Sequence, residues 1–218
     1  MELFAGLGLT LHAFAHHGFA PAAAAENRPA KQRALRASFA NITIVDDALE
    51  FDVDALRAAV RSHAAQRDDA STLDACDTDI AVVSGGVPCQ PVAPNGTQQG
   101  LNDRRAPLMT DALPRAVAAL HARAAEIENH AQFAQLRDGE VLRVVVQKFA
   151  AVGFVLARID FLDAADARAP EVRNRVAIRF ERADVAALLG PCPPLAPIRW
   201  PRRRILLQHA ANSPKGPQ

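Results

Sequence analysis

Short apolar runs alternate with stretches of helical spacing along most of the chain, and this alternation limits the possible folds more than any other feature. Strands are predicted at residues 2–4, 22–25, 42–45, 79–84, 125–129, 154–162 and 175–181. Helices are predicted in GLTLHAFAHHG, PAKQRALRASF, DVDALRAAVRSHAAQ, LMTDALPRAVAALHARAA (with a break at Pro114) and EVLRVVVQKFAAVG. Repeated strand–helix alternation predicts an α/β domain, with helices on both faces of a mostly parallel sheet.

The composition of the whole chain suits one domain in a reducing environment. Half of the 218 residues are hydrophobic, which is enough to bury a core. Three cysteines do not suggest a disulfide framework, so a cytoplasmic setting is the simpler interpretation. No run is apolar and long enough to cross a membrane, and the opening segment lacks the basic leader of a signal peptide. Prolines cluster late, so residues 1–182 are predicted as the domain and residues 183–218 as an irregular Pro/Arg-rich tail.

Four polar or reactive residues fall at the predicted carboxyl ends of strands. They are Glu26, Asp47, Cys89 and Glu128. Ligands of parallel α/β sheets bind at that edge, so these side chains are candidates for one shared site.

The stretch LFAGLG places Gly6 and Gly8 in a turn between a strand and a helix. Glycines in such a turn let the backbone approach a ligand closely, and the helix start offers free N–H groups. Glu26 follows Gly6 by 20 positions, the spacing expected of a ribose-hydroxyl acceptor in a nucleotide-type site. Two interpretations stay open from these residues: a nucleotide-type site, or a plain strand–turn–helix that needs small residues. The full G-x-G-x-x-G pattern is absent, so a dinucleotide fold is the weaker choice.

The stretch VSGGVPCQP sets Cys89 behind Pro88 and two glycines, in a loop rather than inside a strand or helix. A thiol is a good nucleophile only as thiolate, which requires an exposed and electropositive site. The same loop carries Arg104 and Arg105, so we predict a reactive Cys89. The other two cysteines, Cys76 and Cys192, are interpreted as small buried hydrophobic residues.

Five stretches together resemble the motifs of one family, in the same order and spacing. They are ELFAGLG, AENRPAKQRALRASFAN, SGGVPCQPVAPNGTQQGLNDRR, EIEN and DAADARAPEVRNRVAIRF. On these motifs, which cover most of the chain up to Arg182, the sequence is identified as similar to the cytosine-5 DNA methyltransferases. The resemblance implies a Rossmann-like methyltransferase fold that binds S-adenosylmethionine. The residues it assigns to the cofactor are Phe4, Gly6, Gly8, Glu26, Asp47 and Pro88.

The resemblance also implies a mechanism and a partner, double-stranded DNA. The target cytosine is flipped out of the duplex, because its reactive carbon cannot be reached inside the stack. Cys89 would attack carbon 6, and Glu128 would assist at N3 as a hydrogen-bonding carboxyl. Arg173 and Arg175 alternate before a strand and would face the cytosine and the backbone phosphate. The formal net charge is only +1, so contacts to DNA would come from such local clusters of arginine.

The sequence departs from the family pattern at several positions. His130 follows the Glu-Asn pair where most members have valine, Glu171 replaces the glutamine before Arg173, and Leu9 replaces a glycine. The residues after Arg182 are too few for the family's target-recognition region and closing helix, so a truncated, catalytic half is expected. The alternatives are a subunit of a split enzyme whose second chain supplies recognition, an inactive relic, a module that only binds S-adenosylmethionine, and a tRNA cytosine-5 methyltransferase.

Overall fold

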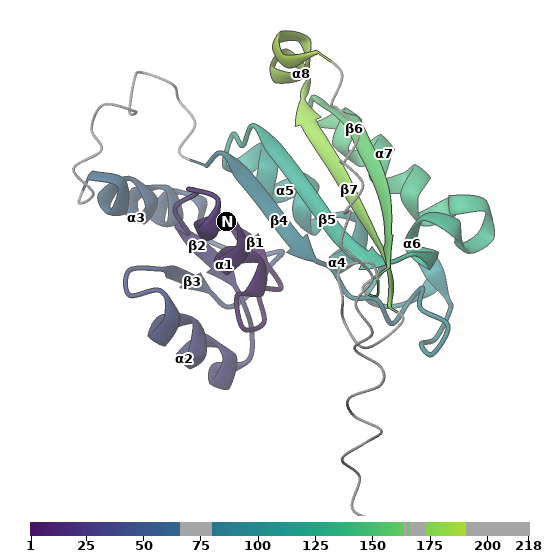
Figure 1. Cartoon of the computed structure of the whole chain (residues 1–218), viewed down its shortest axis with the longest axis horizontal. Helices are drawn as coiled ribbons and strands as arrows, with labels where there is room; N and C mark the ends of the chain where they lie inside the picture. Colours follow the sequence, from purple (N-terminus) through teal and green to yellow (C-terminus); the bar gives the residue numbers. More distant parts are fainter. Residues whose placement is uncertain (66–79, 164, 166–172, 191–218) are drawn as a thin grey trace, which may run out of the picture.

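The computed structural model describes residues 1–65, 80–163, 165 and 173–190, which form a seven-stranded sheet with helices on both faces (Figure 1). The strand order is β3-β2-β1-β4-β5-β7-β6. The strands are β1 Glu2–Leu3, β2 Ala23–Ala25, β3 Thr43–Val45, β4 Val82–Gly86, β5 Ala124–His130, β6 Phe154–Asp163 and β7 Asn174–Arg182.

The first five strands of the chain pair in parallel, and β7 is antiparallel to both of its neighbours, β5 and β6. Parallel neighbours need a long crossover, which the predicted helices supply, whereas antiparallel neighbours such as β6 and β7 do not require one. The predicted fold class, a mostly parallel α/β sheet, is therefore confirmed.

Eight α-helices occur in the described part of the chain. They are α1 Leu9–His16, α2 Pro29–Ser38, α3 Val53–Ala65, α4 Ala106–Thr110, α5 Ala112–Ala119, α6 Gln132–Gln135, α7 Glu140–Ala151 and α8 Ala183–Leu189. Short 3₁₀ turns lie at η2 Gly100–Asn102 and η3 Leu136–Gly139.

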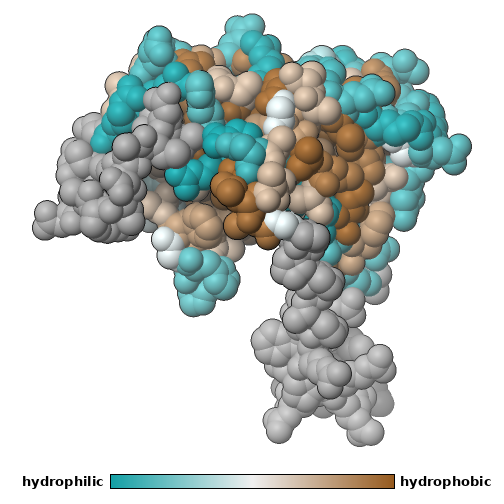
Figure 2. Space-filling view, turned by 90° about the horizontal axis from the view of Figure 1, so that it is seen from above, coloured by the Kyte–Doolittle hydropathy of each residue, from teal (hydrophilic) through white to brown (hydrophobic). Residues whose placement is uncertain are grey.

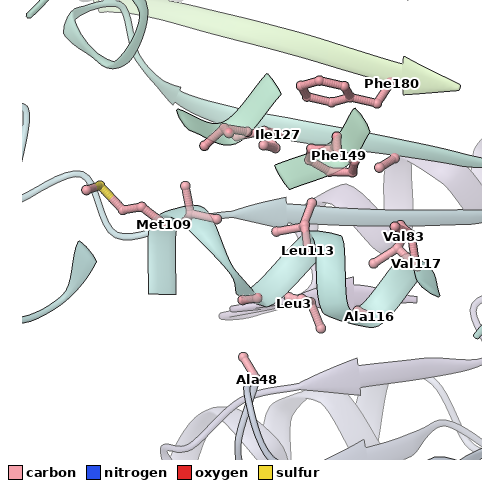
Figure 3. Close-up of a cluster of buried hydrophobic side chains, with 14 of the residues drawn as sticks. Leu3, Ala48, Val83, Met109, Leu113, Ala116, Val117, Ile127, Phe149 and Phe180 are labelled. Atoms are coloured by element: carbon pink, nitrogen blue, oxygen red, sulfur yellow. The ribbon is translucent and has the colours of Figure 1, made fainter. Parts of the chain in front are cut away.

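Two apolar cores lie on opposite faces of the sheet. The larger joins Leu3, Val83 and Ile127 of the sheet to residues of α3, α4, α5 and α7, such as Leu113 and Phe149 (Figure 3). The smaller joins the sheet to α1 and α2 and consists of Ala5, Leu11, Ala24, Leu35 and Ile42. Neighbouring β2 residues belong to different cores because alternate side chains of a strand point to opposite faces. Both faces of the first strands are therefore buried.

Three local predictions need correction. Residues 183–189, expected as the start of an irregular tail, form helix α8, whereas residues 191–218 lie outside the described residues. The break predicted at Pro114 lies at Asp111, between α4 and α5, and Pro114 occupies the first turn of α5, where a proline costs no hydrogen bond. Glu128, expected at the end of a strand, lies inside β5.

Large apolar side chains are also exposed on the surface, and Figure 2 shows apolar areas beside hydrophilic ones on one face. The exposed large apolar residues are Leu7, Leu9, Phe19, Val155, Leu156, Phe161, Leu162, Leu188 and Leu189. None of the helices in the described part of the chain has the length and hydropathy that a membrane span requires.

Candidate functional site

A cavity of about 210 Å³ opens where β4 and β5 approach the start of β7. Its lining residues are Gly86, Val87, Pro88, Cys89, Gln90, Glu128, Asn129, His130, Arg173 and Arg175. The four residues predicted as catalytic therefore line one cavity, although they come from three separate regions of the chain.

Cys89 lies at the first bend of the loop that follows β4. Its carbonyl oxygen accepts hydrogen bonds from the N–H groups of Val92 (2.9 Å) and Ala93 (2.8 Å), so the backbone turns tightly there. The side chain of the buried Asn129 donates from Nδ2 to the Val87 oxygen at 3.0 Å, which ties the loop to β5. Cys89 is exposed and forms no disulfide. The loop thus presents a free thiol at the cavity, as the sequence predicts.

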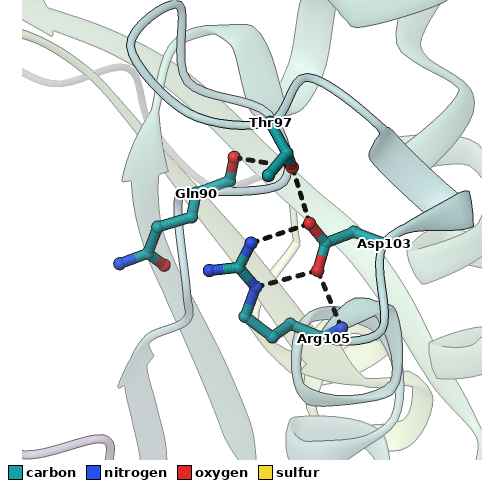
Figure 4. A network of polar contacts seen from close by, with 4 residues as sticks. All are labelled: Gln90, Thr97, Asp103 and Arg105. Carbon is teal, nitrogen blue, oxygen red and sulfur yellow. Dashed lines mark hydrogen bonds and ion pairs between the residues drawn. The ribbon is translucent and has the colours of Figure 1, made fainter.

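A polar network closes the rest of this loop (Figure 4). Asp103 accepts from Arg105 Nε and Nη2, both at 2.8 Å, and from Thr97 Oγ1 at 2.6 Å. Thr97 also donates from its backbone N–H to the Gln90 oxygen at 2.8 Å. A Cβ on Gly96 would lie 2.0 Å from that same oxygen, so only glycine permits this closure.

The charges of this network bear directly on the thiol. Hydrogen bonds from Arg105 and Thr97 hold the pKa of Asp103 well below its usual range. The pKa of Arg105 is raised, mainly by its hydrogen bond to Asp103 and to a small extent by the nearby Cys89. Arg105 therefore lies near Cys89, although its principal partner is Asp103. The sequence did not lead us to predict that Gly96, Thr97 and Asp103 hold the cysteine loop in its conformation. The stretches N-G-T and D-R-R, which contain these residues, are the signal that could have indicated it.

Glu128 and Arg175 form an ion pair on the opposite wall of the cavity. The distance from Arg175 Nε to Glu128 Oε1 is 2.8 Å, and Glu128 remains half exposed. Glu128 pairs across the sheet with Gly86, the last residue of β4, and this pairing brings the carboxylate next to the cysteine loop. Arg173 precedes β7, and its backbone N–H donates to Asp163 Oδ1 at 3.0 Å. Both arginines line the cavity, but only Arg175 belongs to the strand.

His130 completes this wall, at the end of β5 and directly across from Arg175. Its Nδ1 accepts a hydrogen bond from the Gln132 backbone N–H at 3.2 Å. Partial burial and the charge of Arg175 lower the pKa of the His130 imidazole. In the sequence, His130 stands out only as a departure from the family pattern.

The glycine turn lies at the carboxyl end of β1, beside β4. Phe4, Gly6 and Gly8 all have positive φ, at 57°, 58° and 78°. Glu26 is buried at the carboxyl end of β2, where Oε2 accepts from the Gly6 N–H and Oε1 from the Arg28 N–H, both at 2.9 Å. The acidic partner predicted for the turn thus contacts it directly.

Asp47 follows β3, and its side chain is occupied by its own turn. Oδ1 accepts from the N–H groups of Leu49 at 2.7 Å and Glu50 at 3.3 Å. Because β3, β2, β1 and β4 are neighbours in the sheet, Asp47, Glu26, the glycine turn and the cysteine loop follow the same edge in that order. Two cysteines and one acid named from the sequence (Cys76, Cys192 and Glu171) lie outside the described residues.

Comparisons with known proteins agree with this arrangement. Solved structures with the same fold include a protein assigned as a DNA modification methyltransferase, encoded within an Escherichia coli prophage (TM-score 0.58, 20% identity, 88% of this chain and 50% of that chain). A mutant of Spodoptera frugiperda DNMT2 has a TM-score of 0.55 and 15% identity, over 84% of this chain and 50% of that chain. The Entamoeba histolytica methyltransferase EhMeth has a TM-score of 0.53 and 16% identity, over 83% of this chain and 51% of that chain. The chain spans about half the length of these proteins, and a search of curated proteins found no match.

The family assignment depends on the sequence model rather than on these distant structures. The model for the C-5 cytosine-specific DNA methylase matches residues 1–188, which include every strand of the sheet and all the predicted site residues. The seven-stranded sheet is the methyltransferase fold of the solved structures. The chain therefore belongs to the C-5 cytosine-specific DNA methylase family.

Proposed function

We propose that this chain transfers a methyl group from S-adenosylmethionine to carbon 5 of a cytosine flipped out of double-stranded DNA. The observation that carries the proposal is the convergence of Cys89, Glu128, Arg173 and Arg175 on one cavity. At about 210 Å³ the cavity is smaller than the roughly 300–1,000 Å³ of pockets for drug-sized ligands, and this size suits a single base.

The residues after β1, β2 and β3 fit the cofactor that the family uses. Each oxygen of the Glu26 carboxylate accepts one backbone N–H and keeps a lone pair, which can accept a ribose hydroxyl. Phe4 is half buried beside the turn, and a Cβ on Gly6 would meet nothing closer than Lys31 Nζ at 3.8 Å, so the backbone there is open to a ligand. Pro88 and Asp47 are proposed to flank the same ligand. S-adenosylmethionine, when bound there, supplies an electrophilic methyl group.

The chemistry begins at Cys89. Its thiolate attacks carbon 6 of the cytosine and forms a covalent bond, which makes carbon 5 a nucleophile toward the methyl group. The electron pair displaced by this attack reaches N3 of the ring, and Glu128, acting as a carboxylic acid, donates a hydrogen bond to N3 and stabilises it there. After methyl transfer, loss of the carbon 5 proton returns the electron pair to the ring, and the sulfur–carbon bond breaks to restore the thiolate.

Arg175 has two tasks in this account. Its ion pair with Glu128 orients the carboxylate toward the ring, and its guanidinium faces the same cavity from β7. Arg173 is exposed at the entrance, where it can contact a phosphate of the flipped nucleotide. Arg105 lies on the cysteine side, where its charge is paired with that of Asp103.

The test is transfer of radiolabelled methyl groups from S-adenosylmethionine to unmethylated bacterial DNA, with tRNA as a parallel substrate. Cys89→Ser should abolish transfer to DNA and leave S-adenosylmethionine affinity near the wild-type value, because the thiol attacks the base. Full activity of Cys89→Ala would overturn the mechanism. Transfer to tRNA alone would favour the RNA enzyme, and activity only with a second chain present would favour a split enzyme. Cofactor binding without any transfer would indicate a binding module, and loss of both would indicate a relic.

A further inference from the structure

The turn that leads into α7 contains three successive residues with left-handed backbone. Arg137, Asp138 and Gly139 of η3 have φ of 49°, 56° and 77°. Glycine adopts such angles freely, whereas a residue with a Cβ is strained there. Strain of this kind persists only where the surrounding structure holds it, and it clusters at functional sites.

Contacts on both sides hold the strained turn. The Arg143 side chain of α7 donates from Nη1 to the carbonyl oxygen of Asp138. On the other side, a Cβ on Gly139 would lie 2.9 Å from the carbonyl oxygen of Ala134, so the turn also packs closely against α6. The position of the Arg137 backbone is therefore set by its neighbours.

This turn directs the Arg137 side chain toward the far half of the cysteine loop. Its Nη1 donates to the Gln99 oxygen at 3.1 Å and to Glu140 Oε1 at 2.8 Å, and its Nη2 donates to the Gln98 oxygen at 3.3 Å. One planar guanidinium thus bridges two carbonyl oxygens of the loop and a carboxylate of α7.

The loop segment that Arg137 contacts is closely fitted to the turn. Gln98 and Gly100 also have positive φ, at 52° and 57°. A Cβ on Gly100 would collide with Glu140 Oε1 and would lie 3.3 Å from Arg137 Nη1. Left-handed backbone therefore occurs on both sides of the contact and allows the two segments to meet.

The same loop segment is tied to the residues that directly follow Cys89. The Gly100 N–H donates to the Pro91 oxygen at 2.8 Å, and the Thr97 N–H donates to the Gln90 oxygen at 2.8 Å. A displacement of this segment would therefore reach the thiol through one or two backbone hydrogen bonds.

We propose that Arg137 is a positioning residue for Cys89: the strained turn brings a guanidinium to the cysteine loop, and this contact holds the thiol in one geometry. The inference rests on the proposed function, since that function makes Cys89 the nucleophile. Arg137 acts through the loop, because the residues that line the cavity do not include it.

The test compares Arg137→Gly with Asp138→Gly in the full chain. Both substitutions relieve one strained residue, but only the first removes the guanidinium. Hydrogen exchange of the Gly100 and Thr97 amides should become about three- to tenfold faster in Arg137→Gly and stay within about twofold of wild type in Asp138→Gly. Exchange of the β5 amides reports global opening and serves as the internal reference.

The thiol itself is followed by NMR of the chain with cysteine labelled with ¹³C at Cβ, and the Cys89 signal is assigned by its loss in Cys89→Ser. We expect one sharp Cys89 signal in the wild type and in Asp138→Gly, and a broadened or divided signal in Arg137→Gly. Arg137→Lys should recover the sharp signal in part, because an ammonium can donate to the same carbonyl oxygens but lacks the planar fork.

Methyl transfer gives a further measurement. Arg137→Gly should lower kcat about three- to tenfold and leave KM for S-adenosylmethionine within about twofold, because the residues proposed to bind the cofactor are unchanged. An unchanged exchange rate of Gly100, an equal acceleration in β5, or an unchanged Cys89 signal would each overturn the proposal.

The proposed function and the role of Arg137 fail in different ways. A wild type without transfer, together with the expected changes in exchange and in the Cys89 signal, would contradict the proposed enzyme alone. An active wild type whose kcat is unchanged in Arg137→Gly would contradict the role of Arg137 alone.

Discussion

Glu26 holds the glycine turn in place and is also the residue proposed to accept a ligand hydroxyl. It is buried, yet its carboxylate receives N–H groups from Gly6 and Arg28, so its charge is compensated by hydrogen bonds. The same contacts fix the glycine turn next to it. A ligand hydroxyl would find an acceptor already held in place.

We expect Glu26→Ala to weaken S-adenosylmethionine binding by about ten- to a hundredfold, since hydrogen bonds to charged groups contribute about 1.5–3 kcal/mol. Isothermal titration calorimetry measures the affinity, and circular dichroism checks that the variant folds. Glu50→Ala is the matched control, because Glu50 is an exposed acid after β3 and should bind as wild type does. Unchanged affinity of Glu26→Ala would exclude the carboxylate as the ribose acceptor.

Glu2, in β1, is a buried carboxyl whose hydrogen bonds do not offset the effect of burial on its pKa. It is only 4 % exposed, and burial raises its pKa to about 7, although hydrogen bonds from the Thr10 side chain and the Leu11 N–H oppose the shift. A folded-state pKa above the unfolded value means that the folded chain holds the proton more tightly. The stability from this group is therefore fully present below about pH 4.5 and is lost as the pH rises through about 7.

Glu2→Gln should remove this dependence. We expect the variant to match the wild type at pH 5 within about 1 kcal/mol and to be more stable by about 2–3 kcal/mol at pH 8. Urea unfolding at the two pH values measures the difference. A wild type whose stability relative to Glu2→Gln is the same at both pH values would show that Glu2 does not titrate between them.

At the scale of elements, the start of α1 depends on a close approach between the glycine turn and α2. Gly8 has a φ of +78°, and a Cβ there would lie 2.8 Å from Leu35 Cδ2 and 2.9 Å from Phe39 Cε2. Gly18, just beyond α1, has a φ of +88° but open space around it. The two glycines thus share the backbone strain and differ in packing.

We predict that Gly8→Ala lowers the free energy of unfolding by about 2–4 kcal/mol and that Gly18→Ala lowers it by about 1 kcal/mol. Chemical unfolding of both variants provides the comparison. Equal losses would mean that the contact between the turn and α2 relaxes without cost.

The cysteine loop is held from both of its sides. Inside it, Asp103 binds Thr97 and Arg105, and from outside, Arg137 of η3 donates to the carbonyl oxygens of Gln99 (3.1 Å) and Gln98 (3.3 Å). A loop fixed in this way would hold Cys89, the proposed nucleophile, in one geometry before a base binds, which would reduce the ordering required for reaction.

Element positions followed from apolar periodicity, but their roles in the sheet did not. The stretch AEIEN predicted only a weak strand, yet β5 is paired on both sides. Its Ala125, Ile127 and Asn129 are buried, while Glu126 and Glu128 lie on the other face, so its core face is short on strongly apolar residues. Helix α8 was not predicted. None of its residues is buried, so the helix contributes no buried side chain to the core.

At the scale of the whole molecule, the site occupies the point where the strand order reverses. The chain builds β1, β2 and β3 in one direction and then places β4 on the other side of β1. Ligands of open α/β sheets bind in the crevice at such a switch point. The glycine turn after β1 and the cysteine loop after β4 face it from either side.

Sequence motifs predicted which residues would meet, because each motif follows a strand whose end lies at the same edge. The Glu128–Arg175 ion pair could not be predicted, since it depends on the register between β5 and β7, which places His130 opposite Arg175. The Arg105–Asp103 ion pair could not be predicted for a similar reason. The sequence shows that both residues lie in the loop, but it does not show that the loop brings their side chains into contact.

The most direct test of the central claim is a genome-wide map of 5-methylcytosine in a methylation-free bacterial host that expresses this chain alone. We predict methylated cytosines at a defined sequence motif, and we expect none in cells that express Cys89→Ser at the same level. Methylation that persists in the Cys89→Ser cells would contradict Cys89 as the nucleophile. An unmethylated genome in cells that accumulate the folded wild-type chain would contradict methyl transfer by this chain alone.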